Sequence, residues 1–231
     1  MRVAGLAICS AIAIATGATG CDIDLTTKGF PACVQACPEW CWATVIGELK
    51  EYYDVGAAGT PPVSPRCRGY ECKVVSAVRK AACCKNATEC TASRSGPMGC
   101  GNPSSPEEIL QGFQEEIPSQ AWVHMHGRPG FQCTPKDGCY PTEAVLQQLL
   151  MDGTPVARAT HGHITALAGC RQNSGVTEYR VIDSLHDPST ELWMNYTLLT
   201  LGPPPGQGDG PWQDTYYAKG NGSNDRLTVA G

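Results

Sequence analysis

The sequence QACPEWCWATVIGELKEYY at residues 35–53 places a cysteine, Cys41, where a proline-containing segment gives way to an amphipathic pattern. Apolar residues then recur at three- and four-residue steps, the period of a helix with one buried face. Cys41 is therefore expected in the first turn of a helix. Unpaired backbone N–H groups and the positive end of the helix dipole favour an anion there. Because the thiolate is the reactive form of cysteine, Cys41 is a candidate nucleophile.

Gln35 precedes Cys41 by six residues, and Trp42 follows it directly. This Gln-x5-Cys-Trp arrangement at a helix start resembles the nucleophile segment of the papain-like cysteine peptidases. The resemblance implies that the Gln35 side chain and the Cys41 N–H form an oxyanion hole. It also implies that Cys37 is a structural, disulfide-bonded cysteine. A buried cysteine at a helix start is otherwise more often inert or bridged than catalytic, so the interpretation requires a base elsewhere in the chain.

The same resemblance implies a catalytic histidine at the head of a strand of small and apolar residues that ends in glycine. Residues 163–169, HITALAG, are similar to that strand, and the six-residue step to the closing glycine favours His163 over His161. An orienting acid is expected at the end of the next strand, where Asp183 follows YRVI and Asp187 is the competing acid. His163 lies 122 residues after the nucleophile and Asp183 lies 142 after it. The family's usual separation is about 130–150 residues, so the histidine comes slightly early, as in a compact member.

Several features depart from papain itself. Glu39 and Trp40 replace the Gly-Ser that usually precedes the nucleophile, and no Ser-Trp pair follows Asp183. The Trp-Cys-Trp segment resembles compact papain-like peptidases found among bacterial secreted and effector proteins. Only about fourteen residues separate Cys21 from Gln35, so the helical inhibitory prosegment of lysosomal relatives is not expected.

The order of the patterns predicts an α+β fold, because helical periods come first and short strands later. The resemblance makes this a papain-like two-lobed fold, with a helical, disulfide-rich half over residues 21–125 packed on an antiparallel β-rich half over 126–219, and a flexible tail at 220–231. Helices are expected after Cys41, from Pro106 to Pro118 behind a Ser105 cap, and from Pro141 to Gly153, with a short one starting at Cys72. Strands are expected at 155–159, 163–169, 177–183, 191–201 and 212–217.

Composition indicates a secreted, cross-linked protein. The 231 residues include 14 cysteines, more than a cytosolic protein usually carries. Residues 1–20 have the positive start, short apolar core and small residues of a signal peptide, and the apolar run is too short to span a membrane. Lipidation at Cys21 is the alternative. The sequons at Asn86, Asn195 and Asn221 matter only if the host glycosylates.

The net charge of −5 gives no reason to expect nucleic acid as a partner. Two cysteine groups, Cys67-x4-Cys72 and the Cys83-Cys84 pair, raise the possibility of zinc. Their spacing does not match structural zinc knuckles, so disulfides are preferred. No metal or cofactor is expected.

The resemblance implies a secreted cysteine-type peptidase that hydrolyses peptide or isopeptide bonds of a peptide or protein substrate through a Cys41 thioester. Two alternatives remain open. One is a cell-wall amidase or transpeptidase that uses the same cysteine and histidine. The other is an inactive, disulfide-stabilised binding module, because a fold alone does not imply an activity.

Overall fold

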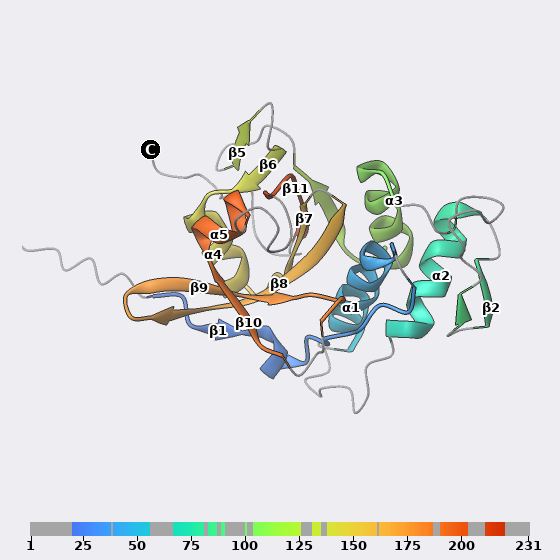
Figure 1. The fold of residues 1–231 in the computed structure, drawn as a ribbon, viewed down its shortest axis with the longest axis horizontal. Helices are drawn as coiled ribbons and strands as arrows, with labels where there is room; N and C mark the ends of the chain where they lie inside the picture. The colour runs from blue at the N-terminus through green and yellow to red at the C-terminus, as the bar shows by residue number, and fades with distance from the viewer. Residues whose placement is uncertain are drawn as a thin grey trace, which may run out of the picture.

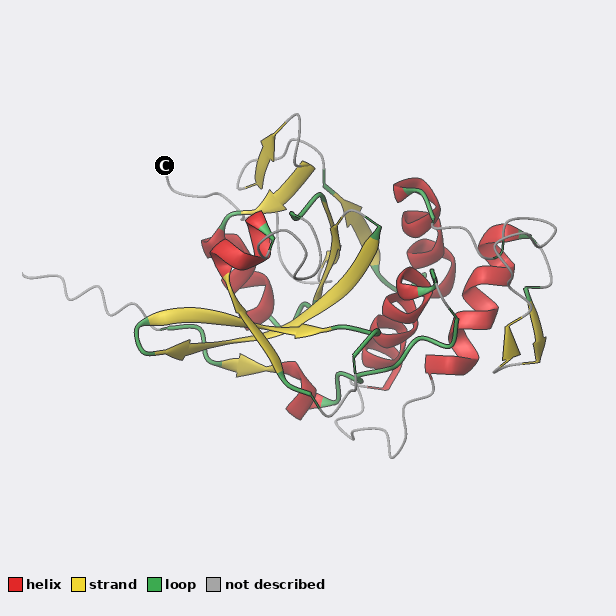
Figure 2. Ribbon diagram, viewed as in Figure 1, coloured by secondary structure: helices red, strands yellow, loops and turns green. Residues whose placement is uncertain are grey.

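A computed structural model describes the chain in segments, namely residues 20–37, 39–55, 67–80, 83–86, 89–90, 100, 104–125, 131–134, 138–160, 162–186, 190–202 and 211–219. These segments contain five α-helices and a mainly antiparallel sheet, so the expected α+β class is confirmed. Helices α1 to α3 gather on one side of the molecule, and the strands of the large sheet lie beside them (Figure 1, Figure 2). The site described below lies where these two parts meet.

The helices follow the predicted pattern for the most part. Their bounds are α1 Cys41–Val55, α2 Cys67–Arg79, α3 Pro106–Glu116, α4 Glu143–Met151 and α5 Tyr196–Leu201, with a 3-10 helix, η1, at Leu25–Lys28. The predicted start of α1 at Cys41 is confirmed. So is the cap of α3, where the Ser105 hydroxyl accepts from the Glu108 N–H and the Glu108 carboxylate accepts from the Ser105 N–H.

The large sheet has the strand order β10-β9-β8-β7-β11-β4, and β1 pairs with β8 outside that path. All the strand pairs in it are antiparallel. Its strands are β1 Ile23–Asp24, β4 Ala121–His124, β7 Val156–Thr160, β8 His163–Asn173, β9 Val176–Ile182, β10 Leu192–Asn195 and β11 Asp214–Lys219. Two separate hairpins are formed by β2 Cys84–Asn86 with β3 Glu89–Cys90, and by β5 Phe131–Thr134 with β6 Gly138–Pro141.

Three expectations about the elements were wrong in part. The strand expected over 191–201 ends at Asn195, whose side chain accepts from the Leu198 N–H and starts α5 instead. Helix α2 begins at Cys67, five residues before the expected short helix, and has thirteen residues. Helix α4 begins at Glu143 because Pro141 is the last residue of β6 and Thr142 is the N-cap.

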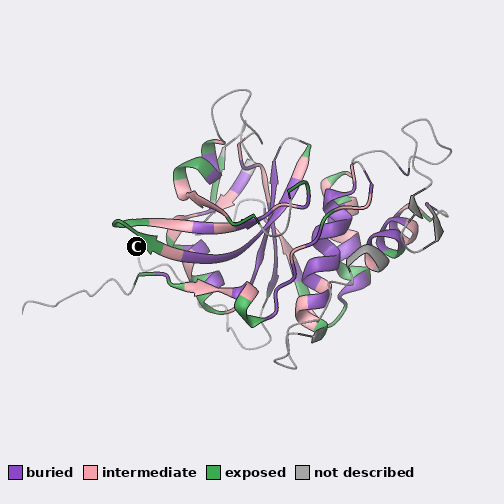
Figure 3. Ribbon diagram, turned by 60° about the horizontal axis from the view of Figure 1, so that its bottom comes forward, coloured by how far each residue is buried: buried purple, intermediate pink, exposed green. Residues whose placement is uncertain are grey.

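The core lies between α1 and the centre of the sheet. Every residue of β7 is buried, and so are Ile164 to Cys170 of β8 (Figure 3). Successive strand residues point to opposite faces, so a strand buried at every position is covered on both sides. Helix α1 packs against β8, α2 and α3. The head of β8 is therefore held beside the start of α1.

Disulfides cross-link the described chain. They join Cys21 to Cys170, Cys83 to Cys100 and Cys133 to Cys139, and Cys33, Cys37 and Cys72 are also disulfide-bonded. The preference for disulfides over zinc is thus confirmed at Cys72 and Cys83. The alternative of a lipid on Cys21 is wrong in this structure, because its sulfur is bonded to Cys170.

Residues 1–19 of the predicted signal peptide, the tail at 220–231 and Asn221 lie outside the described residues. Of the helices that are described, none has the length and apolar character needed to span a membrane.

Candidate active site

Cys41 is the first residue of α1 and carries a free, buried thiol. Every other cysteine whose side chain is described is disulfide-bonded. The start of a helix leaves its first backbone N–H groups without partners inside the helix. A negative charge that develops on or next to the Cys41 sulfur therefore faces backbone donors.

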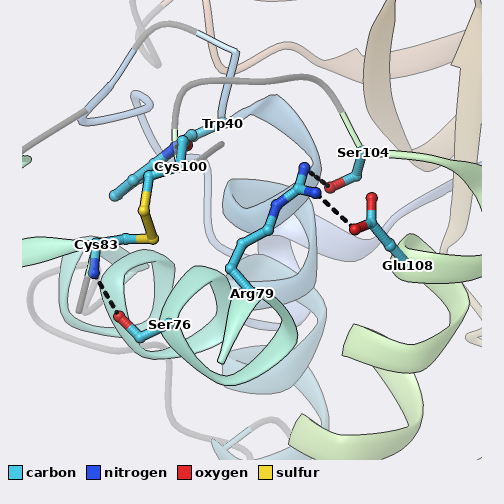
Figure 4. The surroundings of a disulfide bond; sticks show 7 residues. All are labelled: Trp40, Ser76, Arg79, Cys83, Cys100, Ser104 and Glu108. Atoms are coloured by element: carbon cyan, nitrogen blue, oxygen red, sulfur yellow. Dashed lines mark hydrogen bonds and ion pairs between the residues drawn. A yellow bond between two sulfur atoms is a disulfide. The ribbon is translucent and has the colours of Figure 1, made fainter. Parts of the chain in front are cut away.

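The residue before the nucleophile is anchored to the disulfide-rich part of the chain. The indole Nε1 of Trp40 donates to the Cys100 carbonyl at 2.7 Å, and Cys100 is bridged to Cys83 (Figure 4). The same view shows Arg79 of α2 bonded to Glu108 of α3 and to the Ser104 hydroxyl. Trp40 is completely buried. These contacts fix the chain where it enters α1.

His163 lies at the head of β8, between a thiol and a carboxylate. Its Nε2 is 2.8 Å from Oδ1 of Asp183, and its ring also forms a hydrogen bond with Cys41. Because Nε2 is engaged by Asp183, Nδ1 is the nitrogen left for the sulfur. The structure thus brings Cys41, His163 and Asp183 together in that order.

The sheet register explains why these three residues meet. Strand β8 begins at His163 and runs antiparallel to β9, which ends at Ile182, directly before Asp183. The last β8–β9 pair joins Ala166 to Ile182, so the end of β9 lies three residues from the start of β8. Since α1 packs against β8, its first residue lies beside the histidine.

The positive charge of His163 and the negative charge of Asp183 stabilise each other. Burial lowers the pKa of His163, but hydrogen bonds to Asp183 and Cys41 outweigh it and raise the pKa to about 10. Burial raises the pKa of Asp183, but the hydrogen bond to His163 and its charge outweigh burial, so the pKa is lowered. An imidazolium beside a carboxylate is therefore the state expected at neutral pH. Asp183 also lies 3.0 Å from Nδ1 of the exposed His186.

Gln35 is tied to the residue that follows the acid. Its backbone N–H donates to the Ser184 carbonyl at 3.0 Å, and the Ser184 hydroxyl donates to its Oε1 at 2.9 Å. Its Nε2 donates to the Cys37 carbonyl at 3.1 Å. An amide nitrogen carries two hydrogens, so this bond leaves one for another acceptor. Gln35 is not among the residues that line the adjoining cavity.

A cavity of about 250 Å³ opens beside the nucleophile. Residues from β7, β8, β11 and the start of α3 surround it, together with Glu39 and the first two residues of α1. Its walls are Glu39, Cys41, Trp42, Ser104, Pro106, Ile109, Ala159, Thr160, Gly162, His163, Ile164, Gln213, Asp214 and Tyr216.

Two acidic residues of the cavity were not found from the sequence. Glu39 has a φ of 67°, in the left-handed region that costs a non-glycine residue about 1–2 kcal/mol. Asp214 enters from β11, where it is paired in register with Ala159 of β7. That register depends on which strands pair, and no local pattern in the sequence indicates it. Asp214 also lies 3.0 Å from Nε2 of His124.

The two competing residues, His161 and Asp187, lie outside the described residues. No known protein-family model matches the sequence, and no curated protein matches it either.

Proposed function

We propose that this protein is a secreted cysteine-type peptidase with a papain-like two-lobed fold. The observation that carries the proposal is the contact series Cys41, His163, Asp183, in which the free thiol lies at a helix start and the imidazole lies between sulfur and carboxylate. Nucleophile, base and orienting group within hydrogen-bond reach are the general signature of nucleophilic catalysis.

In the proposed mechanism, the Cys41 sulfur attacks the carbonyl carbon of a peptide bond while His163 is protonated. The oxygen becomes an oxyanion, stabilised by the Cys41 N–H and the Gln35 amide; one such donor is worth about 3–4 kcal/mol in transition-state energy. His163 then gives its proton to the leaving amine, which departs as a thioester forms. Water, activated by the now neutral His163, hydrolyses the thioester and restores the thiolate–imidazolium pair.

In this mechanism Asp183 orients the imidazole ring of His163. Its carboxylate holds Nε2 of His163, so that Nδ1 points toward the sulfur. It also accepts from the Leu185 N–H at 2.9 Å, which fixes the carboxylate itself. The charge of Asp183 favours the imidazolium that the leaving-group step requires.

The disulfides support the secreted location. Bonds such as Cys21–Cys170 persist in oxidising compartments. Cys41, His163 and Asp183 would also serve a cell-wall amidase or a transpeptidase. Adding an amine acceptor to the reaction separates these outcomes: a hydrolase releases a free carboxylate, whereas a transpeptidase transfers the acyl group to the amine.

Selective alkylation of Cys41 tests the proposal. At pH below 6, a haloacetamide is expected to modify Cys41 faster than it modifies a free-thiol compound, because the Cys41 sulfur lies at a helix start beside the His163 imidazolium. Mass spectrometry of the unreduced protein identifies the modified residue, and the same protein after unfolding is the control. A Cys41 that is bridged, or that reacts no faster than a free thiol, contradicts the peptidase.

The pH profile of hydrolysis gives a second prediction. Because the pKa of His163 is raised to about 10, the imidazolium persists well above its ordinary value near 6.5. The kcat/KM for an amide substrate is therefore expected to fall only as pH rises toward about 10, where the proton for the leaving amine is lost. Alkylation of Cys41 should continue above that pH, because it needs no proton donor. If hydrolysis and alkylation are lost together, His163 is not the proton donor to the leaving amine.

The raised pKa of His163 also affects the stability of the folded protein. A raised pKa means that the folded protein binds this proton more tightly than the unfolded chain. The stabilisation is complete below about pH 6.5 and is lost as pH rises through about 10. Thermal unfolding across this range should show a lower melting temperature at the alkaline end.

A further inference from the structure

Two buried glutamates hold the segment that carries Gln35. Glu48 of α1 and Glu71 of α2 both have no exposed surface. The Cys33 N–H donates to Oε1 of Glu48 at 2.9 Å, and the Ala36 N–H donates to Oε2 of Glu71 at 2.7 Å. The two carboxyl groups therefore bind backbone amides on either side of Gln35.

This segment has no helix or strand of its own to satisfy its backbone. Buried backbone N–H groups need partners. The segment obtains them from three directions, since the Gln35 N–H donates to the Ser184 carbonyl, while Cys33 and Ala36 use the two glutamates. Loss of either glutamate would remove one of these hydrogen bonds from a backbone N–H of the segment.

Glu71 also reaches the helix of the nucleophile. Its Oε1 accepts from the Thr44 hydroxyl at 3.0 Å, while its Oε2 holds Ala36. Thr44 lies in the first turn of α1, three residues after Cys41, and its N–H donates to the Trp40 carbonyl. One carboxylate thus connects the segment of Gln35 with the first turn of the helix that begins at Cys41.

The pKa of Glu48 reflects its burial and the other carboxylates around it. Burial raises its pKa well above the usual value, and the charges of Glu71, Asp183 and Glu51 raise it further, against the opposing effect of the Cys33 N–H. These carboxylates face Glu48 from α2, from the end of β9 and from α1 itself. The Glu48 carboxyl therefore holds its proton more tightly than an exposed glutamate does, and glutamine is the nearest isostere of the protonated form.

We propose that Glu71, with Glu48, is a positioning residue that acts through Gln35: the two side chains set the Cys33–Ala36 backbone so that the Gln35 amide faces the oxyanion next to Cys41. The inference rests on the proposed function. Neither glutamate touches the reacting atoms. Each acts only through the segment that it binds.

The test compares two reactions of the same sulfur. Acylation of Cys41 by p-nitrophenyl acetate passes through a tetrahedral oxyanion, whereas alkylation by iodoacetamide does not. Glu71→Ala is expected to slow acylation about ten-fold or more and alkylation less than two-fold, because removal of an oxyanion donor outright costs about 10²–10³-fold. Gln35→Ala should show the same split. The double variant should lose no more than Gln35→Ala alone, because both changes act through one group.

Conservative variants are the matched controls. Glu48→Gln and Glu71→Gln each keep an oxygen that can accept from the segment, so both should retain most of the acylation rate at neutral pH. If Glu71→Ala does not fold, Glu71→Asp can be used instead, because it keeps the charge on a shorter side chain. Glu71→Asp should also slow acylation more than alkylation, but by a smaller factor. Equal loss of acylation and alkylation, or additivity with Gln35→Ala, would overturn the proposal.

The two hypotheses fail in different ways. If wild-type Cys41 is alkylated but never acylated, the proposed peptidase function fails. If the wild type is acylated and Glu71→Ala retains the full acylation rate, the function stands and the positioning role is wrong.

Discussion

Replacing His163 with alanine is expected to lower kcat/KM for peptide hydrolysis by about 10⁴-fold or more, with the fold retained. The variant removes the proton donor for the leaving amine and the imidazolium that stabilises the thiolate. Removing one residue of a catalytic triad can cost about as much activity as removing all three. Steady-state kinetics on a peptide substrate measures the loss. Alkylation of Cys41 at pH below 6 should slow in parallel, because an isolated thiol is mostly protonated there.

His161→Ala is the matched control for this variant. His161 was the competing base in the sequence, two residues earlier. The His161→Ala variant should retain nearly full activity, because His163 and not His161 is the proposed base. If the two variants lose activity in the reverse order, the base is His161. The contact of His163 with Asp183 would then be structural.

The nucleophile helix and its neighbours were predictable because their signals are local. The apolar period after Cys41, the Ser105 cap with Glu108 three residues later, and the small apolar strand after His163 each depend on residues close in sequence. Packing of α1 against β8 then needs only the antiparallel order of the strands. Together with the resemblance to papain-like peptidases, these features led to Cys41, His163 and Asp183.

Other features depend on long-range pairing and were missed. Strand β1 lies against β8, where a side chain on Gly169 would come within 2.6 Å of the Ile23 carbonyl oxygen. The glycine that closes the predicted strand thus allows β1 to approach, and β8 continues beyond it. The roles of Glu48 and Glu71 were also hidden. Each binds a backbone amide far away in sequence, and a glutamate within a helical pattern is ordinarily taken as exposed.

Asp183→Ala is expected to lower kcat/KM by about 10³-fold or more, because it removes the acceptor that holds Nε2 of His163 at 2.8 Å. The Leu185 N–H would lose its partner too. Alkylation of Cys41 should slow as well, since the imidazolium loses its carboxylate. Asp187→Ala is the control and should retain nearly full activity, because Asp183 and not Asp187 holds the imidazole.

Asp183→Asn separates orientation from charge. Asparagine keeps an oxygen that can accept from Nε2 of His163, but it lacks the negative charge that helps to raise the histidine pKa. If Asp183 acts mainly by orientation, the asparagine variant should be at least about ten-fold more active than the alanine variant, with the alkaline limb of its pH profile moved to lower pH. Equal loss in both variants would show that charge dominates. A larger loss in Asp187→Ala than in Asp183→Ala would transfer the orienting role to Asp187, because only the acid that holds the imidazole can affect both hydrolysis and alkylation.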